Sequence, residues 1–207
     1  MIYDLSYTIG PDTMAYPGTE KPNLKVMNTV DKDGFQETLI SMYSHAGTHM
    51  DAPAHMLRGA AYLDALPMER FCGRAYVMDC TSYGDDSQIP SDALPALTDI
   101  DFLVLSTGWE DKWGTDAYFG RFPVLSPEAA DIVANAGLSG VGVDMMSVDP
   151  MDTTEFPVHM RFFNKGMVII ENLCNLKELR GKYVELYALP LKYENADGAP
   201  VRVLAKG

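Results

Sequence analysis

Three of the four histidines in the chain lie within one short segment, residues 44–55. His45, His49 and His55 occur there together with Asp51, so that the four side chains stand at positions i, i+4, i+10 and i+6. Imidazole and carboxylate groups suit zinc, manganese or iron(II), whereas calcium and magnesium prefer sites made only of oxygen. A surface loop or a set of buried structural imidazoles is the alternative for an isolated histidine. A cluster of three beside a carboxylate predicts a metal site instead.

The spacing of these four residues fits neither one face of a helix nor one face of a strand from end to end. A bent loop, or one helical turn that runs into extended chain, could bring the side chains to a common point. Gly47 allows the backbone to bend sharply, and Pro53 biases Ala52 towards an extended conformation.

Strands must hold this segment in place. Residues 24–30 and 36–43 are expected to form two strands, with the turn residues 31–34 between them. The second strand leads directly into the histidine segment, which predicts that the ligands lie at the end of the sheet that contains it.

The rest of the chain indicates a mixed order of strands and helices. A helix is expected to begin at Ser126, as the N-cap, and Pro127, and to end near Gly137. Short helical turns are expected within 60–71 and, with Ser91 as the N-cap, within 91–97. Apolar or alternating runs predict strands at 2–8, 74–80, 102–105, 140–145, 167–172, 183–189 and 201–204, with 153–163 as a connection.

Composition limits the possible partners and compartments. A length of 207 residues suits a single domain over residues 1–207. The formal charge of −13 argues against nucleic acid and anionic membrane surfaces as partners, although an anionic small molecule could still bind beside a metal. The sequence contains no apolar run long enough for a membrane span, and its start shows no signal-peptide pattern, so a cytoplasmic location is expected.

Other residues with reactive side chains are better explained structurally. Cys72, Cys80 and Cys174 are odd in number and show no C-x-x-C pairing, so we expect small buried thiols rather than disulfides or metal ligands. Neither Ser44 nor Ser147 lies in a G-x-S-x-G motif. For Asp144 and Asp149, which flank a strand end, turn and cap roles are favoured over catalysis.

Two further residues could belong to the metal site. Glu171 is an acidic residue at the end of the most apolar predicted strand, and the fourth histidine, His159, lies 12 residues before it. From the residues alone, Glu171 could equally pair with an arginine, and His159 could be an exposed loop residue. Two aromatic segments are similarly open. Tyr16 on its Pro-Gly loop is either a hydrophobic anchor or a substrate contact, and residues 108–120 either cap the core or line an aromatic pocket.

The histidine segment resembles the signature H-x-G-T-H-x-D-x-P-x-H of the cyclase family, which includes bacterial kynurenine formamidase and isatin hydrolase. The spacing from His159 to Glu171, and the closing segments 189–191 and 197–202, resemble the family as well. The resemblance covers essentially the whole chain. It implies an α/β (α+β) fold of the swivelling β/β/α type, in which a mixed sheet is flanked by helices, and assembly as a homodimer or homotetramer.

The resemblance also implies a site for one or two divalent metal ions, with zinc expected and manganese as the alternative. His45, His49 and Asp51 match ligands of the first metal, with Asp51 placed to bridge, and His159 and Glu171 match positions that complete a second site. His55 matches the catalytic acid/base, which accounts for the last histidine.

The implied activity is hydrolysis of a non-peptide amide by metal-activated water. The substrate would be a small molecule, either an N-formyl arylamine such as formylkynurenine, an intermediate of tryptophan catabolism, or a cyclic amide. Tyr16 stands where the family's kynurenine formamidases carry tryptophan, and Thr19 replaces an aspartate often found there, so Tyr16 is the expected substrate contact. Cyclisation or dehydration, lactone hydrolysis, and metal or ligand binding without turnover are the alternatives; a spare acid/base at His55 favours an enzyme.

Overall fold

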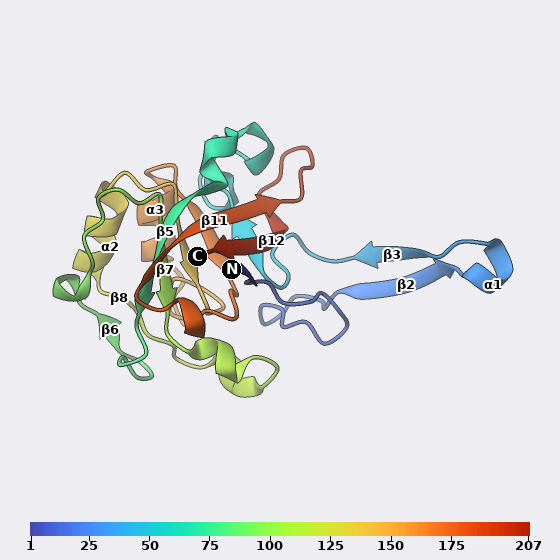
Figure 1. The fold of residues 1–207 in the computed structure, drawn as a ribbon, viewed down its shortest axis with the longest axis horizontal. Coiled ribbons are helices and arrows are strands. Elements are labelled where there is room, and N and C mark those ends of the chain that lie inside the picture. Colours follow the sequence, from blue (N-terminus) through green and yellow to red (C-terminus); the bar gives the residue numbers. More distant parts are fainter.

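A mixed sheet of eight strands forms the centre of the computed structural model, which describes residues 1–207 (Figure 1). The strand order is β1-β12-β11-β5-β7-β9-β10-β4, and β4 also pairs with β12, so the sheet curls back on itself. The strands are β1 (Ile2–Asp4), β4 (His49–Asp51), β5 (Cys72–Asp79), β7 (Phe102–Ser106), β9 (Gly140–Val143), β10 (Val168–Glu171), β11 (Lys182–Pro190) and β12 (Gly198–Lys206).

The four strands β5, β7, β9 and β10 are parallel, and every residue of β7, β9 and β10 is buried, as expected for strands covered on both faces. Along β7, Leu103 and Leu105 point into one apolar core and Phe102 and Val104 into the other, because successive side chains alternate across a sheet. The expectation of a mixed sheet is therefore confirmed, and two helices flank it.

Two α-helices, α2 (Pro127–Asn135) and α3 (Pro157–Phe163), pack against each other and cover the first of these cores. As predicted, Ser126 is the N-cap of α2, where its hydroxyl accepts a hydrogen bond from the backbone N–H of Ala129 at 3.1 Å. The second helix lies within the segment expected to be only a connection, so that part of the prediction was wrong.

Short 3₁₀ turns make up most of the remaining regular structure. The region 60–71 contains η2 (Leu63–Ala65) and η3 (Met68–Arg70), as expected. The predicted cap at Ser91 is wrong, since Ser91 is the first residue of the single turn η4 (Ser91–Ala93) and Pro90 occupies the N-cap. The other turns are η1 (Pro53–His55), η5 (Trp109–Lys112), η6 (Asp116–Phe119) and η7 (Lys177–Leu179), and β6 (Gln88–Ile89) pairs with β8 (Val124–Leu125).

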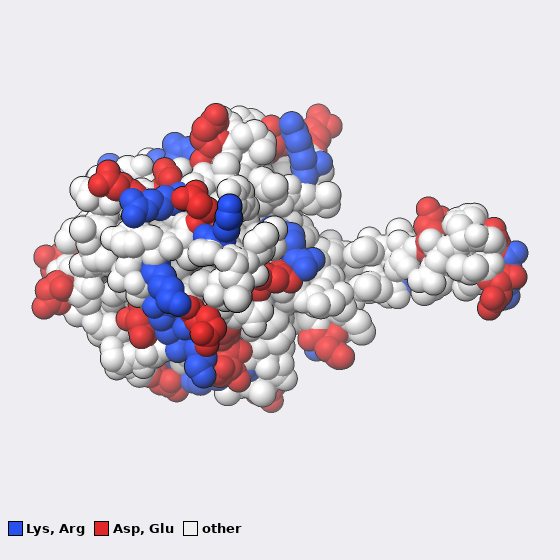
Figure 2. Space-filling model, in the orientation of Figure 1, with Lys and Arg blue, Asp and Glu red and all other residues white.

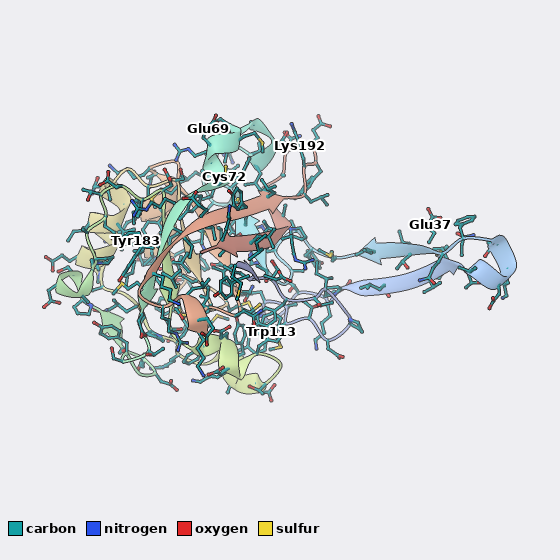
Figure 3. All side chains as sticks on the ribbon, in the orientation of Figure 1. Glu37, Glu69, Cys72, Trp113, Tyr183 and Lys192 are labelled. Atoms are coloured by element: carbon teal, nitrogen blue, oxygen red, sulfur yellow. The ribbon has the colours of Figure 1, made fainter.

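A hairpin arm, residues 23–41, projects from the body of the molecule (Figure 1). It consists of β2 (Asn23–Asn28), the single helical turn α1 (Val30–Asp33) and β3 (Glu37–Ser41). None of its residues is buried, and Glu37, labelled in Figure 3, lies far out along it. In Figure 2 the stem of the arm is mostly uncharged, whereas acidic and basic side chains are interspersed over the visible face of the body.

This arrangement corrects one expectation about the site. The arm is a separate two-stranded sheet, so β3 does not hold the histidine segment at its end. The segment instead contributes its own strand, β4, to the main sheet. None of the helices in the chain has the length and apolar character needed to cross a bilayer.

Candidate metal centre

Strand β4 presents two of the predicted ligands on one face. Because side chains alternate along a strand, His49 and Asp51 point the same way while Met50, between them, is fully buried in the opposite core. Nε2 of His49 lies 3.2 Å from Oδ1 of Asp51, and both side chains are almost completely buried. The strand is held from both sides, since it pairs with β10 and with β12.

His45 approaches the same carboxylate from the loop that precedes β4. Its Nδ1 lies 2.6 Å from Oδ1 of Asp51. The bend that makes this possible occurs at Gly47, whose φ of 66° is in the left-handed region that favours glycine. His45, His49 and Asp51 thus form one group of three potential ligand atoms that lie within 4.8 Å of one another.

A second group is completed by residues from distant parts of the chain. Helix α3 places Nε2 of His159 at 3.4 Å from Oε1 of Glu171, the last residue of β10. The same nitrogen lies 3.8 Å from Oδ2 of Asp51. Asp51, His159 and Glu171 therefore form a second group of donors, and Asp51 belongs to both groups, with one oxygen facing each.

These two groups fit divalent metal ions by the chemistry of their atoms. One offers two imidazoles and a carboxylate, and the other offers one imidazole and two carboxylates. Three protein ligands of this kind leave a coordination position open for water or substrate, as in catalytic zinc sites. The structure brings together all five residues that the sequence singled out as ligands.

The electrostatics of the site favour positive charge. Burial alone would lower the pKa of His49, but the carboxylates of Asp51 and Glu171 outweigh burial and raise that pKa to about 10. For His159, burial is likewise outweighed by Asp149 and Glu171, and the pKa is raised to about 10. Burial would raise the pKa of Asp51, yet His45 and His49 hold it well below its ordinary value. A divalent metal ion bound here would supply positive charge to the same carboxylates. It could therefore replace the protons that the carboxylates hold on His49 and His159.

The ring nitrogens that face away from the donor groups are also held. Nδ1 of His49 donates to the backbone carbonyl of Gly47 at 2.9 Å, and Nδ1 of His159 lies 2.7 Å from Oδ2 of Asp149. These contacts leave Nε2 of each histidine free to bind a metal. Asp149 also accepts the backbone N–H groups of Val158 and His159 at the start of α3, so its expected cap role is confirmed. Its contact with the ring of His159 is a second role that was not expected.

A buried network that the sequence did not reveal supports the loop around Gly47. The amide of Asn172 donates to the Gly47 carbonyl at 2.8 Å, and its Oδ1 accepts the hydroxyl of Tyr118 at 2.7 Å. The hydroxyl of Thr48 donates to the backbone carbonyl of Asn172 at 2.6 Å. Asn172 adopts a φ of 58°, a conformation that asparagine tolerates better than most residues.

The aromatic segment 108–120 caps the core and does not line the pocket. Trp109 and Tyr118 are buried within the first core. Trp113, labelled in Figure 3, stacks on Tyr7 with ring centroids 3.7 Å apart. Of the two roles considered for this segment, the structure supports only the first.

His55 lies beside the donor groups. It is the last residue of η1, and its ring centroid is 4.0 Å from that of His45. Burial is the main cause that lowers its pKa, and the nearby His45 and His159 act in the same direction. The lowered pKa of His55 favours its neutral imidazole, the form that can accept a proton.

A pocket of about 290 Å³ opens over these residues, which is near the lower end of the roughly 300–1,000 Å³ usual for ligand pockets. Tyr16, 37% exposed, and Thr19 contribute to its wall from the loop that precedes the arm. Met56, Met146 and Phe156 supply apolar surface. Tyr16 thus lies at the wall of the pocket beside the donor groups.

One acidic residue next to this pocket was not predicted. Oδ2 of Asp197 lies 3.1 Å from Nε2 of His45 and 3.9 Å from Nδ1 of His55. In the sequence, the pair Asp197-Gly198 has the composition of a turn, which conceals any other role.

Asp144 and the three cysteines have structural roles. Asp144 accepts hydrogen bonds from the backbone and hydroxyl of Thr107 and from the backbone of Gly108, which is the structural role expected for it. The three cysteines are free; Cys80 and Cys174 are buried as predicted, and burial raises the pKa of each to about 12, whereas Cys72 is only half-buried.

Comparison with known proteins gives consistent results. The model of the cyclase family matches residues 3–150. A kynurenine formamidase of Salinibacter ruber is 32% identical over 99% of this chain and 97% of its own length, and one of Bacillus cytotoxicus is 29% identical over 98% and 96%. Among solved structures, an isatin hydrolase bound to the product analogue thioisatinate superimposes with a TM-score of 0.87 at 26% identity, over 99% of this chain and 91% of that one. A potential metal-dependent hydrolase with cyclase activity gives a TM-score of 0.81 at 29% identity, over 99% and 96%.

Proposed function

Because the chain belongs to the cyclase family, we propose that it is a metal-dependent hydrolase that cleaves non-peptide amide bonds. Its relatives include proteins named kynurenine formamidase and isatin hydrolase. The observation that carries the proposal is the position of Asp51, whose two carboxylate oxygens face two separate groups of ligand atoms. The substrate class is an N-formyl arylamine such as formylkynurenine, or a cyclic amide such as isatin.

The residues that would hold metal are His45, His49 and Asp51 in the first group and Asp51, His159 and Glu171 in the second. We propose zinc as the metal, with manganese as the alternative, because both accept imidazole and carboxylate ligands. A divalent ion bound there would lower the pKa of coordinated water to about 7 and polarise a substrate carbonyl.

His55 is the proposed acid/base. It lies on the pocket wall, 4.0 Å from His45 between ring centroids, and its neutral imidazole could accept a proton from water and deliver it to the leaving amine. Its lowered pKa supports the base role, since the neutral form dominates at pH 7.

Substrate recognition is proposed to depend on the apolar part of the pocket. Met56, Met146 and Phe156 provide surfaces on which a planar aromatic ring could pack, and Tyr16 lies at the pocket wall. The volume of about 290 Å³ suits a small molecule.

We also propose that the chain forms a homo-oligomer, a homodimer or homotetramer, through its hairpin arm. A sheet of only two strands is marginally stable in water. Many exposed apolar side chains along such a sheet indicate a surface that another protein chain covers. The exposed apolar side chains of the arm are Leu24, Val26, Met27, Val30, Phe35, Leu39 and Ile40. Light scattering should give more than one chain per particle, and the double variant Leu39→Ser/Ile40→Ser should shift the protein towards the monomer.

A cytoplasmic location is proposed as well, because all three cysteines are free and the cytoplasm keeps thiols reduced.

A screen of formylkynurenine, isatin and a lactone, with and without added zinc or manganese, tests the proposed reaction. Amide hydrolysis that requires metal is the expected result. Lactone hydrolysis, or ring closure with loss of water, is the second candidate, which the likeness to a potential metal-dependent hydrolase with cyclase activity favours. Turnover of the lactone alone would support that second candidate.

A further inference from the structure

We propose that Asp197 is a positioning residue for the metal centre. It holds Nε2 of His45, so that this histidine presents Nδ1 to the metal while His49 and His159 present Nε2. The inference rests on the proposed function, because it assumes that His45 is a metal ligand.

His45 lies between two carboxylates, one at each ring nitrogen. Its Nδ1 is 2.6 Å from Oδ1 of Asp51, and its Nε2 is 3.1 Å from Oδ2 of Asp197. Asp51 is shared by the two buried donor groups, whereas the third group of possible ligand atoms, His45, His55 and Asp197, is only half-buried. We therefore take Nδ1, which faces Asp51, as the nitrogen that faces the metal centre. Asp197, with 42% of its side chain exposed, lies on the outer side of the ring.

The other two histidine ligands are held in a similar way, but their outward nitrogen is Nδ1 rather than Nε2. Each has its outward nitrogen, Nδ1, fixed by an acceptor: the carbonyl of Gly47 for His49 and the carboxylate of Asp149 for His159. Asp197 completes this pattern for His45. All three imidazoles then have one nitrogen fixed and one aimed at the metal centre, as is usual for metal-bound histidine.

The position of the single proton on a neutral imidazole explains why His45 needs Asp197 as an acceptor. A neutral ring carries one proton, so a ring that binds metal through Nδ1 must carry that proton on Nε2. Asp197 can accept this proton in a hydrogen bond, which fixes the tautomer and makes His45 a more basic ligand. If Nε2 were the ligand instead, the Nδ1 proton would be donated to Asp51 and would occupy an oxygen that the metal centre needs.

The backbone places Asp197 independently of the metal. Gly198 pairs with Asp51 across the β12–β4 ladder, and the carbonyl of Asp197 accepts the backbone N–H of Ala52 at 2.9 Å. The hydroxyl of Tyr193 contacts the carbonyl of Gly198 and also lies 3.2 Å from Oδ1 of Asp197. The sheet therefore fixes the backbone of Asp197 at a position from which its carboxylate reaches His45.

Gly198 provides the space that this orientation of His45 requires. A Cβ atom at position 198 would lie 2.7 Å from Nε2 of His45, closer than real Cβ contacts come. Any larger residue would push the ring away from its place between the two carboxylates.

Zinc affinity tests the proposal. We would measure it by competition with a chromophoric chelator at fixed pH, for the wild type, Asp197→Ala and Asp197→Asn. Loss of an outer partner of a metal-bound histidine typically weakens metal binding about 10–100-fold, which is the loss expected for Asp197→Ala. Asp197→Asn keeps an acceptor oxygen and should lose less. Glu194→Gln, which removes an exposed charge from the same loop, is the matched control and should bind zinc like the wild type.

A spectroscopic measurement on the wild type avoids any folding defect in the variants. Long-range ¹H–¹⁵N spectra of the zinc-loaded protein should show His45 bound through Nδ1 with its proton on Nε2, and the reverse for His49 and His159. Coordination of His45 through Nε2, or wild-type zinc affinity in Asp197→Ala, would overturn the proposal. Failure of the wild type to bind zinc would instead contradict the metal centre, and the proposed function with it.

Discussion

Glu171 lies directly opposite His49 in the antiparallel pair of β10 and β4. This register places Oε2 of Glu171 3.4 Å from Nε2 of His49, although the two residues belong to different motifs of the sequence. The end of the most apolar strand is thereby joined to the histidine segment, and a charged group is held where burial would otherwise exclude it. The second donor group exists because of this pairing.

Replacement of Glu171 by glutamine should therefore weaken metal binding. The amide is neutral and a poorer ligand, so we expect zinc affinity to fall at least as far as the roughly 10–100-fold caused by loss of an outer partner. Chelator competition measures the change, and Glu178→Gln, at an exposed position, serves as the control. If zinc affinity and stoichiometry are unchanged in this variant, Glu171 is not a metal ligand.

Substitution of His55 by alanine should separate chemistry from metal binding. General acid–base catalysis typically contributes about 10²–10⁴-fold, so kcat should fall by that factor while zinc affinity stays at the wild-type value. Steady-state kinetics with a substrate that the wild type hydrolyses, together with zinc titration, give both quantities. Full activity with metal bound would rule out the acid/base role, and loss of zinc would make His55 a ligand.

Metal binding should release protons at neutral pH. The pKa values of His49 and His159 are both raised to about 10 in the metal-free protein, so both rings are protonated at pH 7.5, yet ligands must be neutral. Zinc must displace these protons, and its apparent affinity should increase as the pH rises towards 10. In the metal-free protein the same two groups stabilise the fold fully below about 6.5, the ordinary histidine pKa, and lose that contribution as the pH passes through 10.

Calorimetry in buffers of different ionisation enthalpy measures this proton release directly. Titration of zinc at pH 7.5 should show heats that depend on the buffer. Heats that are the same in every buffer would mean that the ligands are already neutral, contrary to the electrostatics of the site.

Loss of the Tyr118 hydroxyl should destabilise the loop that carries the ligands. Tyr118→Phe leaves Oδ1 of Asn172 without its donor in a buried position, which typically costs about 1–3 kcal/mol. Denaturant unfolding of the metal-free protein measures the change in the free energy of unfolding. Tyr76→Phe, at a half-buried tyrosine, is the control, and equal small effects in both variants would show that the network contributes nothing specific.

The local part of the site could be predicted from sequence because its residues are close together in the chain. The segment around Gly47 carries His45, His49 and Asp51, and composition alone marks it as unusual. The strands were predictable for a similar reason, since runs such as Phe102–Ser106 are apolar throughout and all of their residues are buried.

Long-range relationships could not be predicted in the same way. Helix α3, which carries His159, has Phe156 at its N-cap, with a φ of 49°, and its first N–H groups are accepted by Asp149. No capping residue beside the helix marks its start. Asp197 resembles a turn residue until the pairing of β12 with β4 brings it to His45. The histidine segment was expected at the end of the sheet that contains residues 36–43, but that strand belongs to the separate arm, and the segment forms β4 in the main sheet.

The most direct test of the metal-dependent hydrolase is turnover as a function of added zinc. The protein would be stripped with a chelator and assayed on formylkynurenine and isatin while zinc is restored, with Asp51→Asn in parallel. We predict no turnover by the stripped protein, recovery that saturates with zinc in the wild type, and none in Asp51→Asn, because Asp51 faces both donor groups. Full turnover by the stripped wild type, or recovery by Asp51→Asn, would contradict the account.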